Sequence, residues 1–172
     1  MLAFALGGLS KSIGLPQVKL GWMAVAGPDV AVATALDRLE LVCDTYLTVS
    51  TPVQASAAEL LHAGATVREQ IAARVRANLQ LLRDRLASTP SCRAFRAEGG
   101  WYAVVQVPTL QPEEELVVSL LEREGVLAHP GYFFDFPRES FIVVSLLPPP
   151  ERFVEGIGRI LRHFDCRVSG HE

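Results

Sequence analysis

The sequence predicts an α/β unit followed by an α+β unit, and three patterns along the chain indicate this order. Two short apolar runs bounded by glycines, Leu2–Leu6 and Leu20–Ala26, are typical of buried strands. A long helical pattern follows at Val67–Leu86, where apolar residues recur at steps of three or four. After this helix the pattern changes to short strands and helices. We therefore expect two domains, residues 1–65 and residues 66–172, with the long helix entering the second.

The first domain contains a loop and two helix signals besides its strands. Leu9–Lys19 lies between the two apolar runs and is expected to be a polar loop. Asp29 offers an N-cap for a helix that continues to about Tyr46. Thr51-Pro52 starts another helix, which we expect to end near Leu61.

The second domain is expected to alternate strands and helices. A helix over Glu113–Glu124 has acidic residues in its first turn, where the helix dipole favours them. A last helix follows Pro148–Pro150, with Phe153, Ile157, Leu161 and Phe164 on one face. The expected strands are Arg93–Ala97, Trp101–Val107, Val126–His129 and Phe141–Leu147.

Composition and charge exclude several classes of protein. The chain has 172 residues, of which 49% are hydrophobic and 20% charged, so it can bury a core and is not typical of disordered proteins. Its net charge of -3 provides no basic patch for nucleic-acid phosphates or anionic lipid. We therefore expect no nucleic-acid partner.

The cysteines and the apolar start of the chain indicate a cytoplasmic protein without a metal site. Cys43, Cys92 and Cys166 are odd in number and widely spaced, with no histidine at ligand spacing, so we expect reduced thiols. The apolar start at Met1–Leu9 lacks the positive region of a signal peptide, and Lys11 interrupts it. No apolar run reaches the roughly 18 residues of a membrane span.

The use of lysine along the chain identifies a candidate site. Of 16 basic residues only Lys11 and Lys19 are lysines, and both lie in the glycine-bounded loop. Arginine does not lose its proton to become a nucleophile, whereas a lysine amine can form a Schiff base. A loop at a strand end lies at the sheet edge where ligands of α/β proteins bind. A second cation beside a desolvated amine favours the neutral form that condensation needs.

The Lys11 motif resembles the lysine signature of class I/II aminotransferases, which are fold-type I enzymes dependent on pyridoxal 5'-phosphate. The matching residues are Gly8–Leu15 (GLSKSIGL) and Lys19–Trp22 (KLGW). The resemblance implies that Lys11 forms the internal aldimine, and that its amine, once substrate displaces it, moves a proton between the substrate Cα and the cofactor. It also implies that Ser10 and Lys19 bind the cofactor phosphate.

The resemblance extends more loosely along the chain and implies the C-terminal portion of such an enzyme. This portion comprises the end of the large-domain sheet and the α+β small domain. The implied substrates are an amino acid and a 2-oxo acid, and the implied assembly is a homodimer. The segments that carry the resemblance are Thr51–Gln54, Gly99–Tyr102, Gly125–Gly131 and Ser140–Leu147.

Three positions depart from the family pattern. Lys19 stands where the family usually has arginine, and Gln17 where the residue is usually smaller or basic. Val143 occupies the position of the arginine that binds the substrate carboxylate in most of the family, so substrate recognition cannot be carried over. Arg138 in the adjacent turn is a candidate for that contact, the alternative being a solvated loop arginine. The aromatic turn Phe133–Phe136 is expected to line either a pocket or the core.

The groups that the family places upstream of the lysine determine what this chain is expected to do. Only ten residues precede Lys11, whereas the acid that protonates the pyridine nitrogen and the ring-stacking aromatic lie further upstream in the family. We therefore expect an incomplete and inactive portion of an aminotransferase. The alternatives are a non-catalytic folding or assembly module, and a pyridoxal-phosphate enzyme of another reaction type, such as a β-lyase.

Overall fold

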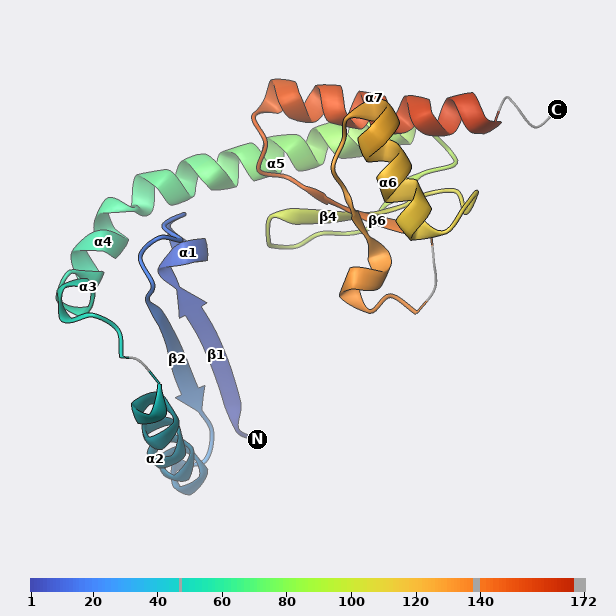
Figure 1. Cartoon of the computed structure of the whole chain (residues 1–172). Helices are drawn as coiled ribbons and strands as arrows, with labels where there is room; N and C mark the ends of the chain where they lie inside the picture. Colours follow the sequence, from blue (N-terminus) through green and yellow to red (C-terminus); the bar gives the residue numbers. More distant parts are fainter. Residues whose placement is uncertain (47, 138–139, 169–172) are drawn as a thin grey trace. The chain divides into compact units, whose positions relative to one another are not determined.

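The computed structural model describes residues 1–46, 48–137 and 140–168 (Figure 1). The chain divides into two compact units, unit 1 (Met1–Ile71) and unit 2 (Ala72–Glu172). The division falls inside the long helix α5 (Ala65–Ala87) rather than at its start.

Unit 1 is built on an antiparallel hairpin of β1 (Ala3–Gly8) and β2 (Gly21–Ala26) (Figure 1). Both strands lie where the sequence predicted them. The expectation that they are buried is wrong for this chain, since Leu6 is 79% exposed and most of both strands is exposed. The sheet has only two strands, and the described residues leave much of its apolar surface uncovered.

The helices of unit 1 differ from expectation in three details. Helix α1 (Leu9–Ser12) forms one turn within the segment predicted to be a loop. Pro28 is the N-cap of α2 (Asp29–Thr45), so Asp29 is its first residue and not its cap. The helix predicted to start at Thr51 is split into α3 (Thr51–Ala55) and α4 (Ala57–Ala63).

Unit 2 is a four-stranded antiparallel sheet in the order β3-β4-β6-β5, with helices α6 and α7 (Figure 1). The four strands predicted from the sequence are present but shorter. Of the predicted strand Val126–His129, only His129 pairs. The elements are β3 (Arg93–Ala94), β4 (Tyr102–Gln106), α6 (Glu113–Glu124), β5 (His129–Pro130), the 3-10 turn η1 (Gly131–Phe134), β6 (Phe141–Ser145) and α7 (Pro150–Val168).

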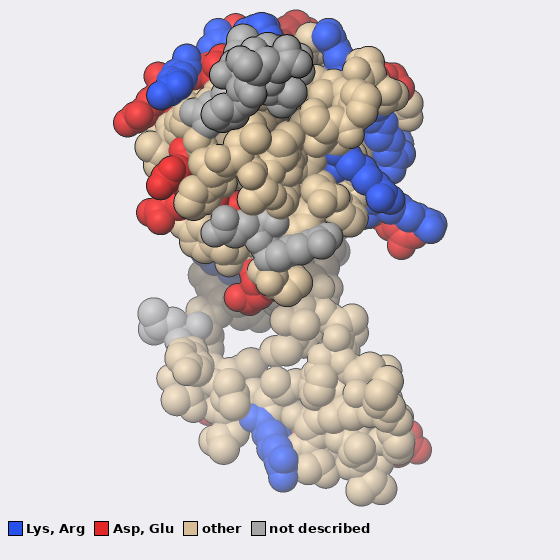
Figure 2. All heavy atoms as spheres, turned by 90° about the vertical axis from the view of Figure 1, so that its right-hand side faces the viewer, with Lys and Arg blue, Asp and Glu red and all other residues tan. Residues whose placement is uncertain are grey.

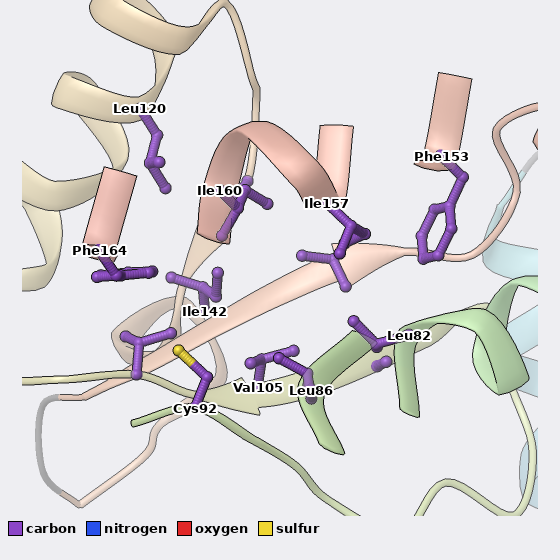
Figure 3. Close-up of a cluster of buried hydrophobic side chains, with 14 of the residues drawn as sticks. Leu82, Leu86, Cys92, Val105, Leu120, Ile142, Phe153, Ile157, Ile160 and Phe164 are labelled. Atoms are coloured by element: carbon purple, nitrogen blue, oxygen red, sulfur yellow. The ribbon is translucent and has the colours of Figure 1, made fainter. Parts of the chain in front are cut away.

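The core of unit 2 fills the space between one face of the sheet and the helices (Figure 3). Alternate residues of β6 and its extension, including Ile142 and Leu146, point into this core, as the two-residue period of a strand requires. The apolar face predicted for α7 is buried, apart from Leu161, which is partly buried. Core residues from the helices are Leu82, Leu86, Leu116, Leu120, Phe153, Ile157, Ile160 and Phe164.

Two buried polar side chains fasten segments that are far apart in the sequence. The Glu113 carboxylate, 2% exposed, accepts hydrogen bonds from the backbone N–H of Phe141 at 2.7 Å and of Tyr132 at 2.9 Å. The sequence correctly placed Glu113 among the acidic residues of the first turn of α6, but it did not predict that this side chain is buried with two backbone partners. Asn78 of α5 donates to the carbonyls of Leu146 at 3.0 Å and Pro148 at 2.9 Å.

Replacing Asn78 with alanine is expected to destabilise unit 2 by about 2 kcal/mol, because the buried carbonyl of Leu146 and the partly buried carbonyl of Pro148 lose their donor. Urea unfolding followed by circular dichroism measures the change. Gln80→Ala is the matched control on the same helix, since the exposed Gln80 bonds only to Asp84. Equal stabilities for the two variants would show that the Asn78 bonds contribute nothing.

Candidate active site

The three residues predicted to bind the cofactor lie around one hollow in unit 1. It has a volume of about 770 Å³ and lies where β1 leads into α1 and the chain returns to β2. The structure therefore brings Ser10, Lys11 and Lys19 together, although Lys11 and Lys19 are eight positions apart. The lining residues are Leu6, Gly7, Gly8, Ser10, Lys11, Ser12, Lys19, Leu20 and Gly21.

Backbone hydrogen bonds hold the lysine segment against the hairpin. The N–H of Leu9 donates to the carbonyl of Leu20 at 3.1 Å, which ties the start of α1 to the start of β2. The carbonyl of Leu9 accepts from Ile13 and Leu15, each at 3.2 Å. The segment that carries Lys11 is therefore fixed at both ends.

Apolar side chains on either side of Lys11 anchor α1 to the rest of unit 1. Leu9 and Ile13 are buried, while Lys11 between them is exposed. Gly64 packs so closely on Ile13 that a Cβ at Gly64 would lie 2.5 Å from its side chain. The spacing of Leu9, Lys11 and Ile13 thus turns the amine outward while its neighbours are buried.

Two glycines of the hollow are required by close contacts. A Cβ at Gly7 would lie 2.4 Å from the indole ring of Trp22, and a Cβ at Gly8 would lie 3.0 Å from the carbonyl oxygen of Leu20. The first distance excludes any side chain unless Trp22 moves. The glycine pair that ends β1 therefore permits the close approach of β2.

The donor set of the hollow suits a small anion that also carries a carbonyl group. Lys11 and Lys19 provide two amines, Ser10 and Ser12 provide two hydroxyls, and none of the nine lining residues is acidic. A carbonyl can condense with a lysine amine, and a phosphate accepts from cations and hydroxyls. None of the nine is aromatic either, so these residues offer no aromatic side chain on which a bound ring could stack. The predicted desolvation of Lys11 is not provided by the described residues, because Lys11 is exposed.

The other sequence candidates lie outside this hollow. Arg138, the candidate for the substrate carboxylate, lies outside the described residues. Val143 is 3% exposed and pairs with Val104 and His129, so it is a residue of an ordinary core strand, as expected. In the aromatic turn Phe133 and Phe134 are exposed, although the Phe133 ring lies 4.8 Å from that of Tyr132. The Phe136 ring lies 4.8 Å from that of Phe141.

Sequence reasoning missed one polar residue of the hollow, Ser12, although it lies inside the lysine motif. Its position directly after Lys11 was the available signal.

In the part of the chain that the structure describes, no cluster of three potential metal ligands occurs. Within the same residues, no helix combines the length and apolar character needed to span a membrane.

Comparison with known proteins establishes the family. The family model described as aminotransferase class I and II matches residues 3–158. The chain therefore belongs to the class I and II aminotransferase family. Curated relatives include an alanine aminotransferase of Mycobacterium tuberculosis, 24% identical over 169 residues, with 93% of this chain and 39% of the relative covered. A glutamate-pyruvate aminotransferase of Haemophilus influenzae is 22% identical over 168 residues, with 94% and 42% covered.

Solved structures show the same fold. An alanine aminotransferase from Pyrococcus furiosus superimposes with a TM-score of 0.78 at 21% identity, covering 96% of this chain and 43% of that one. An aminotransferase from Escherichia coli gives a TM-score of 0.81 at 19% identity, covering 96% and 42%. The fold is therefore that of part of a fold-type I transferase, and the chain spans about two fifths of the length of these relatives.

Proposed function

We propose that this chain supplies the cofactor-binding lysine of a pyridoxal-phosphate-dependent aminotransferase, which transfers an amino group between an amino acid and a 2-oxo acid. The observation that carries the proposal is the hollow in which Lys11, Lys19 and Ser10 meet. Membership of the aminotransferase family supports the reaction class. A β-lyase would use the same lysine, so transfer of the amino group to a 2-oxo acid must be measured directly to distinguish the two reactions.

The residues of the hollow have separate roles in this proposal. When bound, pyridoxal phosphate supplies an aldehyde that condenses with primary amines and a ring that withdraws electrons from the substrate Cα. The Lys11 amine holds the cofactor and, once released, takes a proton from the substrate Cα and returns it. The Ser10 hydroxyl donates to the phosphate. Lys19 adds a positive point charge there, without the bidentate geometry that an arginine would offer.

Groups from outside these 172 residues complete the proposed site. The lining of the hollow contains no acid to protonate the ring nitrogen and no aromatic ring to stack on the cofactor. The relatives are more than twice as long as the matched region. We propose that further polypeptide and a second copy of the protein, as a homodimer, provide the missing groups.

Reduction with borohydride in the presence of pyridoxal phosphate tests the lysine assignment in the protein as its gene expresses it. The bond to Lys11 becomes permanent, and trypsin no longer cleaves after this residue. The expected labelled peptide therefore contains Lys11 uncleaved and ends at Lys19. Attachment to Lys19 would instead label residues 12–38, because the next tryptic site after Lys19 is Arg38.

The two labelled peptides distinguish the amines directly by mass. Label in residues 12–38 alone, or no label at cofactor concentrations that saturate other aminotransferases, would overturn the assignment. Lys11→Arg is the matched control, because it keeps the charge, restores tryptic cleavage and should abolish the label.

A further inference from the structure

Gly64 joins α4 to α5 and lies against the segment that carries Lys11. Its backbone has φ of -74° and ψ of -7°, a right-handed conformation that every residue type adopts. Alanine is more stable than glycine in such a conformation, because glycine loses more backbone freedom when the chain folds. Backbone conformation alone therefore does not explain why residue 64 is glycine.

The side chain of Ile13 occupies the space where a Cβ of residue 64 would lie. A Cβ built at Gly64 would be 2.5 Å from both Cβ and Cγ2 of Ile13 and 2.9 Å from its Cδ1. The Cβ of Ile13 is bonded to the backbone, so a change of rotamer does not relieve this overlap. Ile13 is 4% exposed, and close packing limits the directions in which it can move. A side chain at position 64 must therefore displace a backbone segment.

Hydrogen bonds make the α4–α5 junction the more rigid of the two segments. The N–H of Gly64 donates to the carbonyl of Leu60 at 2.9 Å, and its carbonyl accepts from Arg68 at 3.0 Å. Both peptide groups thus continue the bonding of helices, one of which is the 23-residue α5. Helix α1 has only four residues, and Ile13 at its end donates to Leu9 at 3.2 Å. A single helical turn is the weaker structure, so crowding at this contact moves α1.

A movement of α1 displaces Lys11, which precedes Ile13 by two positions. The start of α1 stays tied to the hairpin, since the N–H of Leu9 donates to the carbonyl of Leu20 at 3.1 Å. Pushing only the end of α1 therefore tilts the helix. Lys19 directly precedes Leu20 and stays with the hairpin, so the tilt changes the position of one amine relative to the other.

We propose that Gly64 and Ile13 are positioning residues, whose contact sets the place of the Lys11 amine in the hollow. The proposal rests on the proposed function of Lys11 and names the residues that act on it from the buried side of α1. Misplacing a reacting group by about 1 Å can cost a factor of ~100 in rate. The missing Cβ at Gly64 thus contributes to cofactor chemistry, although neither positioning residue lines the hollow.

Reductive labelling of the protein as its gene expresses it measures the place of the amine without relying on turnover. Pyridoxal phosphate is titrated, borohydride fixes it to the amines, and peptide masses report Lys11 and Lys19 separately. Gly64→Ala should raise the cofactor concentration that half-labels Lys11 about tenfold, without reducing any label at Lys19. Gly156→Ala is the matched control, because no described atom lies within 4 Å of a Cβ built at this glycine of α7.

A milder pair of variants keeps the test decisive if Gly64→Ala does not fold. Ile13→Val removes Cδ1, one of the three atoms nearest to a Cβ at Gly64, and should weaken half-labelling of Lys11 about threefold. Ile157→Val removes the same methyl group in the core of unit 2, at the same exposure of 4%, and should leave the labelling unchanged.

A double-mutant cycle tests whether the two residues act through their contact. Ile13→Ala removes Cγ2 and Cδ1, so adding Gly64→Ala to it should weaken half-labelling less than about threefold further. In Gly64→Ala alone, turnover at saturating cofactor should fall about tenfold while the KM for the amino donor stays within about twofold. This split is expected because the Lys11 amine moves a proton and does not hold the donor.

Normal half-labelling of Lys11 in folded Gly64→Ala would overturn the inference, as would equal effects of Ile13→Val and Ile157→Val. Parallel losses of label at Lys11 and Lys19 would also overturn it, because they would indicate a general distortion of the hollow. A full tenfold effect of Gly64→Ala in the Ile13→Ala background would show that the contact is not the cause. Absence of label at Lys11 in the unsubstituted protein would instead reject the proposed function, and this inference with it.

Discussion

Replacing Lys11 with arginine is expected to reduce amino-group transfer by the protein expressed from its gene at least ~1,000-fold. Arginine keeps a positive charge in the hollow but does not offer a neutral amine, either to hold the cofactor or to move the proton at the substrate Cα. Transfer is measured as conversion of a 2-oxo acid in the presence of an amino donor and pyridoxal phosphate.

Lys19 provides the matched comparison within the same hollow. Lys19→Arg should retain activity and bind the cofactor at least as tightly, because a guanidinium can contact a phosphate at two oxygens. Lys19→Met should weaken cofactor binding about tenfold with a smaller effect on turnover of the loaded enzyme. Activity that survived Lys11→Arg would contradict the role of this amine, and identical losses at both positions would show that the two lysines do not have separate roles.

The 172-residue polypeptide studied by itself is expected to show no transamination and to self-associate. Large apolar side chains on both hairpin strands are exposed, including Phe4, Leu6, Trp22 and Met23. The visible face of unit 1 carries few charged side chains, whereas that of unit 2 carries many (Figure 2). Exposed apolar surface and unpaired strand edges promote association.

Analytical ultracentrifugation across protein concentration, alongside the transamination assay, checks this expectation. A mixed-charge variant, Leu6→Lys with Met23→Glu, should reduce association, because both side chains lie exposed on the paired strands. Transamination at the rate of an ordinary enzyme would contradict the prediction. A stable monomer without activity would instead favour the non-catalytic module considered from the sequence.

The lysine site could be predicted largely from residue types, because lysine chemistry and the glycine-bounded motif are local properties. The single turn of α1 was missed, since four residues are too few to show a helical period. The exposure of Lys11 was also missed. Desolvation depends on what covers the hairpin, and the nine lining residues do not supply that cover.

For unit 2, the sequence predicted which helices and strands are present better than the residues at which they begin and end. The period of α7 and the alternation in β6 depend on one buried face and are visible in the sequence. Glu113 could not be distinguished from Glu114 and Glu115, because its two partners lie 19 and 28 residues away. The late start of β5 depends on the path that the chain takes after Gly125, whose backbone is left-handed with φ of 64°.

Helix α5 couples the unfolding of the two units, because each unit contains part of this helix. At its start, Val67 and Ile71 contact the glycine that follows the lysine helix, and further along Leu82 and Leu86 belong to the core of unit 2. A continuous helix needs only one nucleation event, so each unit helps to keep the other's part of α5 folded. Hydrogen exchange along Ala65–Ala87 should therefore change gradually across the unit boundary, and a mutation that loosens the core near Leu82 should speed exchange beside Lys11 as well.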